Sequence, residues 1–253
     1  MRATRPRVAA RAVVALTLAA PAQAATPAPL PSPGPLRLSL HGGFVPGSPH
    51  FTGTQTFTEF AEQGRIESQY REDPGPGFEA GLRWRFARRL GVSAAVSLGR
   101  RQEAGSFSAT LPHPLYFGTP RHAAGDFRGG SQRETAAHLD LAFLGNAGRL
   151  QWSAFAGPSL MRVQADLVRR VEYTQTYPYD TVTVTATPFA TTSGNAVGFN
   201  VGAGLDWQVA RHVAIGTQVR FSRATVGLKP TPDDRLDVVA GGAYLTGGLR
   251  LDF

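Results

Sequence analysis

Residues 196–222 read AVGFNVGAGLDWQVARHVAIGTQVRFS, and they carry the clearest structural pattern in the chain. From 196 to 209, apolar side chains alternate with glycine or polar residues. The same alternation returns over 212–222, after a short connection at 210–211. Because successive side chains of a β-strand point to opposite faces, each segment predicts a strand with one apolar face and one polar face. The short connection predicts an antiparallel hairpin.

Further segments show the same alternation, and each is about as long as the 9–11 residues of a tilted membrane strand. They are 36–44, 78–86, 90–99, 135–144, 149–161 and 242–253. The short connections (87–89, 145–148 and 210–211) alternate with the long ones (45–77, 100–134, 162–195 and 223–241). This order places every short turn and both termini at one end. We therefore predict an all-β fold, an eight-stranded antiparallel transmembrane β-barrel built as an up-and-down meander, with short periplasmic turns and long extracellular loops.

Two features favour a membrane barrel over a soluble one, whose apolar face would point inward. First, aromatic residues of the apolar face gather near the short turns, as they do at a membrane interface. The predicted girdle consists of Trp84, Phe86, Phe143, Trp152, Trp207 and Phe253. Second, the polar face is rich in Gly and Ser, and the only Lys of the chain is Lys229 in a predicted loop. A water-facing outer surface would carry many mixed charges instead.

The N-terminal residues differ from the rest of the chain. Arg2, Arg5, Arg7 and Arg11 precede a short apolar stretch at 12–20, and Ala22-Gln23-Ala24 follows as a small-x-small cleavage site. This order is typical of a secretory signal peptide, and the apolar stretch falls far short of the roughly 20 residues of a membrane helix. We predict a cleaved signal peptide at 1–24, a Pro-rich linker at 25–35, a barrel domain at 36–253, and export to the bacterial outer membrane.

Composition excludes several function classes. The chain has no Cys, so it has neither disulfides nor thiolate metal sites. Its formal net charge of +8 falls to +4 when the four Arg of the signal peptide leave, which is weak support for a nucleic-acid partner. His113 and His122 lie in one long predicted loop without a third ligand. We therefore predict no nucleic acid, no metal and no other cofactor.

The hairpin quoted above, the terminal strand GGAYLTGGLRLDF at 241–253 and the signal peptide together resemble one known family. It is the bacterial outer-membrane barrel family typified by outer-membrane proteins A, X and W. The resemblance implies that Leu249, Leu251 and Phe253 form the C-terminal signal that the barrel-assembly machinery recognises. It also implies a monomer surrounded by outer-membrane lipid and lipopolysaccharide.

The polar face carries charges of both signs, and an eight-stranded barrel is just wide enough for its interior to be filled by side chains. These inward residues are Arg37, Glu79, Arg83, Arg85, Asp140, Asp206, Arg220, Arg250 and Asp252. Because buried charges normally need partners, we predict an ion-pair network in the lumen that leaves no wide pore. The alternative is a narrow polar conduit.

Three functions follow from this barrel. The first is a structural or surface-interaction role, in which an extracellular ligand could bind the long loops. The segment 162–195, rich in Thr, Tyr and Val, could form a hairpin above the membrane. The second, which the resemblance to outer-membrane protein W implies, is a narrow channel or carrier for small hydrophobic compounds. The third is a lipid A-modifying enzyme, for which His138 and Asp140 could form an orienting pair. Since the sequence places no Ser beside them, we predict no catalytic residue and no enzyme.

Overall fold

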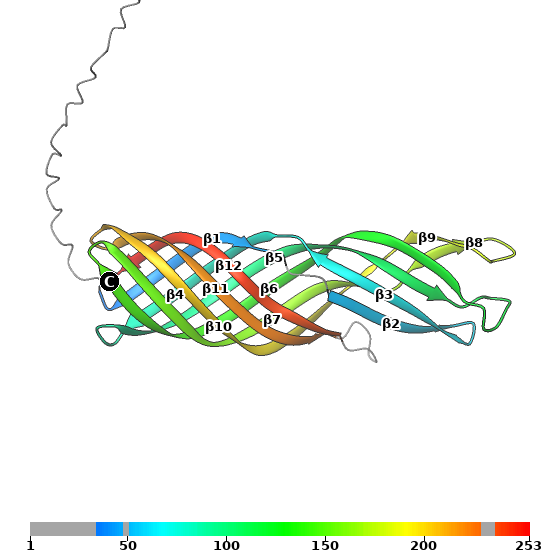
Figure 1. Cartoon of the computed structure of the whole chain (residues 1–253), viewed down its shortest axis with the longest axis horizontal. Coiled ribbons are helices and arrows are strands. Elements are labelled where there is room, and N and C mark those ends of the chain that lie inside the picture. The colour runs from blue at the N-terminus through cyan, green and yellow to red at the C-terminus, as the bar shows by residue number, and fades with distance from the viewer. Residues whose placement is uncertain (1–33, 48–50, 229–235) are drawn as a thin grey trace, which may run out of the picture.

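The computed structural model describes residues 34–47, 51–228 and 236–253, and these form an elongated barrel (Figure 1). The predicted signal peptide at 1–24 and nearly all of the predicted linker at 25–35 lie outside this range. Among the described residues, none belongs to a helix long and apolar enough to cross a membrane.

The described residues form twelve strands, and each pairs only with antiparallel neighbours. Their bounds are β1 (Leu36–Val45), β2 (Phe51–Glu59), β3 (Glu62–Glu72), β4 (Gly75–Arg85), β5 (Leu90–Leu111), β6 (Arg121–Ala147), β7 (Leu150–Val168), β8 (Glu172–Gln175), β9 (Val182–Ala186), β10 (Phe189–Ala210), β11 (Val213–Leu228) and β12 (Leu236–Asp252).

Eight of these strands form a closed ring in the order β4, β1, β12, β11, β10, β7, β6 and β5. The pairing of β5 with both β6 and β4 closes the ring, from Leu90 opposite Phe143 on one side and from Arg85 opposite Gly91 on the other. The fold class predicted from the alternating segments is thereby confirmed. The three short turns lie at the end that also holds the C-terminus, whereas the β2–β3 and β8–β9 hairpins lie at the opposite end (Figure 1).

The four segments predicted as long loops are mostly strand, and this part of the prediction is wrong. The segment 45–77 contains β2 and β3, of which β3 pairs with the second half of β5. The segment 100–134 is divided between β5 and β6, and 223–241 between β11 and β12. The segment 162–195 includes the ends of β7 and β10 together with the small β8–β9 hairpin, so the expected hairpin is present.

These extensions escaped the sequence analysis because the alternation continues there with its polarity reversed. In β7 the outward side chains change from Leu160 to Arg162, while the inward side chains change from Ser159 to Met161 and Val163. In β11 the outward Phe221 is followed by Arg223, and the inward Ser222 by Ala224. The half of the barrel near the short turns, which we call the lower half, is therefore apolar outside and polar inside. The half near the β2–β3 and β8–β9 hairpins, which we call the upper half, is polar outside and apolar inside.

The length of the strands shows how far the barrel extends past the apolar band. The 22 residues of β5 span about 75 Å along the strand at about 3.4 Å per residue, or about 55 Å of height at a tilt of about 40°. An outer-membrane barrel has an apolar band only about 25 Å tall. On β10, the outward rings of Phe199 and Trp207 both lie in the band, about 20 Å apart in height at the same rise per residue and the same tilt. About half of the barrel thus lies beyond the band.

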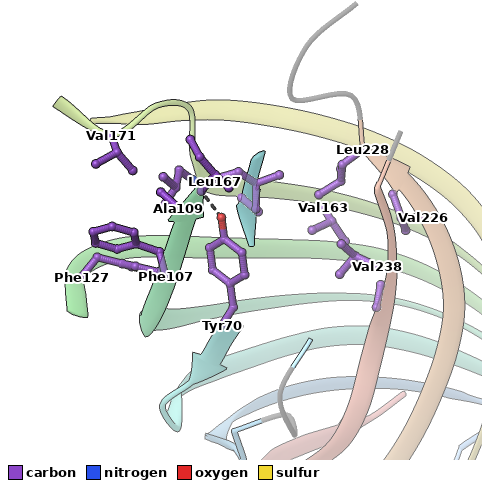
Figure 2. Packing of buried hydrophobic residues seen from close by; sticks show 14 of the residues in the cluster. Tyr70, Phe107, Ala109, Phe127, Val163, Leu167, Val171, Val226, Leu228 and Val238 are labelled. Carbon is purple, nitrogen blue, oxygen red and sulfur yellow. Dashed lines mark hydrogen bonds between the residues drawn. The ribbon is translucent and has the colours of Figure 1, made fainter. Parts of the chain in front are cut away.

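An apolar cluster fills the upper half of the barrel (Figure 2). Val163, Leu167, Val226 and Leu228 are fully buried within it, and each such side chain stabilises the fold by roughly 1.5–3 kcal/mol. The buried hydroxyl of Tyr70 accepts a bond from the backbone nitrogen of Val168 at 2.9 Å, which satisfies its one polar atom. This part of the barrel has the interior of a water-soluble protein.

Candidate functional site

The lumen is the candidate site, because it holds the charged residues that the sequence analysis selected. At the short-turn end, Arg37 joins two strands across the ring. Its Nε lies 2.6 Å from Asp252 Oδ1, and its Nη1 lies 2.9 Å from Asp206 Oδ2. Arg250 also pairs with Asp206. Two cations and two carboxylates therefore balance one another at this level.

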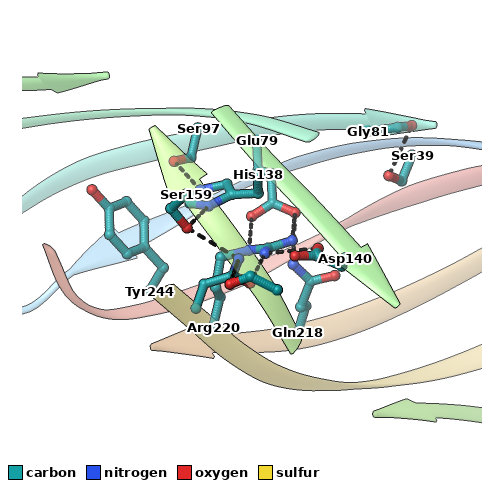
Figure 3. Close-up of polar contacts among 12 residues, drawn as sticks. Ser39, Glu79, Gly81, Ser97, His138, Asp140, Ser159, Gln218, Arg220 and Tyr244 are labelled. Atoms are coloured by element: carbon teal, nitrogen blue, oxygen red, sulfur yellow. Dashed lines mark hydrogen bonds and ion pairs between the residues drawn. The ribbon is translucent and has the colours of Figure 1, made fainter. Parts of the chain in front are cut away.

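A second layer lies further into the barrel and centres on Arg220 (Figure 3). Arg220 Nε is 3.0 Å from Glu79 Oε2, and Arg220 Nη1 is 2.9 Å from Asp140 Oδ2. Gln218 Nε2 donates to Glu79 at 2.7 Å, and the Arg220 guanidinium lies 4.5 Å from the ring centre of Phe155. Arg220, Glu79 and Asp140 are all buried, and removing their charges from water is costly. Pairing each charge with an opposite charge offsets this cost.

His138 does not pair with Asp140. Its two ring nitrogens instead lie 2.9 Å from the Ser97 hydroxyl and 2.8 Å from the Ser159 hydroxyl (Figure 3). The sequence analysis missed both serines, although each stands on the inward face of its strand, since cross-strand neighbours are set by register. Within the described part of the chain, no carboxylate bonds to the imidazole of the buried Ser97–His138–Ser159 set, and the nearby Asp140 is bound to Arg220. It lacks the acid that orients the base in a nucleophilic triad.

A third charged layer, which the sequence analysis missed, lies where the polar lumen meets the apolar cluster. Arg101 Nη1 is 2.7 Å from Glu72 and 3.8 Å from Glu134. The Tyr244 hydroxyl donates to Glu134 at 3.1 Å. Glu103 lies in the same layer and is 1% exposed, yet neither of its carboxylate oxygens accepts a hydrogen bond. Burial, reinforced by the carboxylate of Glu72, raises the pKa of Glu103 to about 8.

The remaining predicted lumen residues, Arg83 and Arg85, lie near the short-turn end. Arg85 Nη2 donates to the carbonyl of Gly34 at 3.5 Å. Arg83 faces Arg37 and Ser93 across its two neighbouring strands, and it forms no hydrogen bond or ion pair with any described residue. The structure therefore joins seven of the nine predicted charges into ion pairs, and Arg83 lies outside this network.

The predicted girdle residues all point outward near the short-turn end. Among them, the rings of Trp84 and Phe86 are 6.0 Å apart, and those of Phe143 and Trp152 are 5.6 Å apart. Leu249 and Leu251 of the predicted assembly signal also face outward on β12, and Phe253 bonds through its backbone to Leu36.

The polar lumen narrows above the short-turn end. A pocket of about 370 Å³ opens at the short-turn end, lined mainly by polar and charged side chains together with Leu144 and Trp152. Deeper in the lumen, a cavity of about 20 Å³ lies among Glu79, Arg83, Arg220 and Arg250, which is room for about one water molecule. Above this cavity stand the Arg101 layer and then the apolar cluster. The arrangement favours a filled interior over a conduit.

An outward apolar band around a closed ring of antiparallel strands, with a charged interior, defines the class of outer-membrane β-barrels. One solved structure with this fold is the outer membrane protein OprG from Pseudomonas aeruginosa, which is 10% identical in sequence. The match covers 87% of this chain and 97% of OprG, with a TM-score of 0.50. At this identity, the likeness shows the fold.

Two further solved structures are more distant. Neisserial surface protein A is 12% identical over 88% of this chain and 99% of its own, with a TM-score of 0.42. Ail, the attachment invasion locus protein of Yersinia pestis, is 12% identical over 85% and 97% of the two chains, with a TM-score of 0.38. No family model matches the chain, and no curated protein sequence matches it.

Proposed function

We propose that this protein is a non-conducting barrel of the bacterial outer membrane, which carries a rigid, protein-filled extension above the lipid and acts through surface contacts. The observation that carries the proposal is the filled lumen. Two ion-pair layers, the Arg101 layer and the apolar cluster follow one another along the axis. Breaking so many buried partners to open a pore would be costly, since each broken buried pair costs about 3–5 kcal/mol.

Single-channel recording in planar bilayers tests this proposal. We expect insertion of the refolded protein without stable conductance at neutral pH. The double variant Glu79→Gln/Asp140→Asn removes both carboxylates that hold Arg220 in place, and it should also stay closed, because the Arg101 layer and the apolar cluster still fill the lumen above that layer. Steady openings of the unmodified protein would contradict a filled lumen.

The outer surface just above the apolar band supports lipopolysaccharide as a lipid partner. Arg100 on β5 and Arg133 on β6 lie directly opposite each other and both face outward. Arg162 follows the last apolar outward residue of β7, Leu160. Like charges opposite one another destabilise a sheet, so this basic patch gains from an anion between its members. The phosphates of lipid A would stand at this level, and guanidinium groups bind phosphate with two parallel hydrogen bonds.

The basic patch predicts retention of phosphorylated lipid A. We expect the double variant Arg100→Gln/Arg133→Gln to retain less lipid A after detergent extraction, as measured by mass spectrometry. The control is Arg65→Gln, an outward arginine that is already paired with Glu67 at 2.7 Å. Equal retention by the unmodified protein, the double variant and the control would refute the assignment, as would equal binding of dephosphorylated lipid A.

The tips of the extension support a surface contact. Phe60 in the β2–β3 turn and Tyr116 and Phe117 between β5 and β6 are exposed, and Phe117 is 80% exposed. Glu62 accepts a 2.6 Å bond from the backbone nitrogen of Gly118, which ties the two tips together. Phe60 and Ala61 both have positive φ, at 51° and 63°, a conformation that favours Gly or Asn. Non-Gly residues held there concentrate at functional sites.

We therefore infer that the tips contact apolar or aromatic surfaces outside the cell. Cells that produce the Phe60→Ser/Phe117→Ser variant should adhere less to a hydrophobic surface than cells that produce the unmodified protein. Arg169→Ser, an exposed polar residue of the same extension, is the control. Unchanged adhesion at equal surface amounts would argue against this role for the tips.

A carrier for small hydrophobic compounds is the second candidate, and one observation favours it. The pairing of β12 with β1 ends at Leu245 opposite Phe44, and within the described chain β2 pairs with β3 alone. The wall beside the apolar cluster therefore lacks a ladder between β2 and β12. Saturable binding of an apolar fluorescent probe that is lost in Leu167→Gln would favour this candidate over our proposal.

An enzymatic role is not part of our proposal. His138 is buried in the lumen between two serines, away from the outer rim where a lipid A substrate would meet the barrel. Mass spectrometry of lipid A from strains with and without the protein tests this reading. A modification that disappears in His138→Ala would overturn it.

A further inference from the structure

The short-turn end of the barrel carries arginines that the lumen network does not use. They surround the pocket of about 370 Å³ described above, which is within the usual size of a small-ligand site. Its charged lining consists of Arg37, Arg83, Arg85, Arg88, Arg89, Asp206 and Asp252. The pocket thus holds five cations and two carboxylates.

The two carboxylates are already neutralised. Asp252 binds Arg37, and Asp206 binds both Arg37 and Arg250. They leave Arg83, Arg88 and Arg89 without a carboxylate in the pocket lining.

Arg83 is the key residue, because it projects from β4 into the lumen. Its Nε is buried without an acceptor, and the side chain forms no hydrogen bond or ion pair with a described residue. A buried guanidinium nitrogen without an acceptor is costly, and the cost falls when an anion accepts a hydrogen bond from it. Arg88 and Arg89 stand in the β4–β5 turn at the rim of the pocket, where they too form no ion pair with a described residue.

The chain offers no acid of its own for this pocket from its N-terminal side. Gly34 and Pro35 line the pocket, and residues 1–33, which precede them, contain neither Asp nor Glu. Residues 1–33 therefore supply no carboxylate to these arginines.

We propose that this pocket binds a phosphate-bearing anion at the periplasmic mouth of the barrel, with Arg83 at its floor and Arg88 and Arg89 at its rim. Guanidinium groups match phosphate geometry with paired donors, and several of them together favour a multiply charged group. The side-chain amide of Asn146 adds a neutral donor to the lining. The same chemistry belongs to a soluble phosphorylated compound and to the head group of a phospholipid in the inner leaflet.

The test uses two probes on the protein in neutral detergent at low salt. Calorimetry measures the binding of pyrophosphate, and native mass spectrometry measures the retention of phosphatidylglycerol. We expect saturable binding of at least one probe. The Arg83→Gln variant and the Arg88→Gln/Arg89→Gln variant should each bind at least about tenfold more weakly, because each removes charged hydrogen bonds. Binding of pyrophosphate alone would assign a soluble ligand, and retention of phosphatidylglycerol alone would assign a lipid head group.

The control is Arg211→Gln, an exposed arginine in the β10–β11 turn that does not line the pocket. It should bind both probes like the unmodified protein. If Arg83→Gln fails to fold, the Arg88→Gln/Arg89→Gln variant, which we call the rim variant, still tests the proposal. Arg88 and Arg89 are exposed turn residues, so their replacement should not disturb folding. The proposal is overturned if neither probe binds saturably, or if Arg211→Gln weakens binding as much as the rim variant does.

Discussion

The buried carboxyl of Glu103 provides a sharp test of the interior described above. Burial and the neighbouring Glu72 raise its pKa from 4.5 to about 8. In the unfolded chain the carboxyl loses its proton near pH 4.5, whereas in the folded barrel it keeps the proton up to about pH 8. Between these values the folded state binds more protons, so the free energy of unfolding falls as pH rises.

The pKa shift sets the size of this effect. Because a change of one in the pKa corresponds to about 1.4 kcal/mol, the rise in the pKa of Glu103 lowers the free energy of unfolding by at most about 5 kcal/mol. Relaxation of the surroundings lowers this value, and we expect a loss of roughly 2–4 kcal/mol between about pH 5 and about pH 8.5. The Glu103→Gln variant keeps the shape of the side chain but does not titrate. Its free energy of unfolding should therefore not show the loss that Glu103 causes as pH rises.

Denaturant unfolding in phospholipid vesicles, followed by tryptophan fluorescence, measures the free energy of unfolding of the unmodified protein and of the variant at each pH. At about pH 8.5 the Glu103→Gln variant should be more stable than the unmodified protein, and at about pH 5 the two should agree closely. The control is Glu67→Gln on the outward face of β3, where the side chain is 57% exposed. If Glu103→Gln were equally or less stable than the unmodified protein at the higher pH, Glu103 would not be an unpartnered buried carboxyl.

Three further predictions concern the layers of the barrel. Arg220→Met leaves Glu79 and Asp140 without their shared cation, and it should lower the free energy of unfolding by about 3–5 kcal/mol in the same assay; a loss below about 1 kcal/mol would mean that the pair is hydrated. Leu167→Ala opens a cavity in the apolar cluster and should cost about 2–5 kcal/mol, clearly more than the outward Leu160→Ala; equal losses would place Leu167 outside a packed core. Phe253→Ala should slow insertion by the purified barrel-assembly machinery, as measured by heat-modifiable gel mobility, whereas an unchanged rate would remove this residue from the assembly signal.

The sequence predicts the membrane half of the fold well, for a physical reason. In lipid, the apolar face must point outward on every strand, so period-two alternation with one fixed polarity marks all eight strands. Above the lipid the polarity reverses, as at Leu160 and Arg162 of β7, and the strand no longer matches the expected pattern. A bulge at Glu103 and Ala104 further shifts the phase of β5 against β6. Both effects made the extension resemble loops.

The members of the lumen network could be chosen from the sequence, but their partners could not. Arg220 and Glu79 are 141 positions apart, and only the closure of the ring brings them together. The pairing of Asp140 with Arg220, and not with its near neighbour His138, also depends on which inward side chains share a level. The Arg101 layer was missed because three of its members, Glu72, Arg101 and Glu134, lie in segments predicted as loops.

The reversal of polarity along the strands is the central claim, and thiol labelling tests it most directly. The chain has no Cys, so single cysteines can be introduced at 156, 162 and 163 of β7 without competing thiols. The first faces outward in the apolar band, the second faces outward above it, and the third is buried in the apolar cluster. With a membrane-impermeant maleimide on intact cells, Arg162→Cys should react quickly, whereas Ala156→Cys and Val163→Cys should stay protected. Rapid labelling at 163 together with protection at 162 would contradict the account.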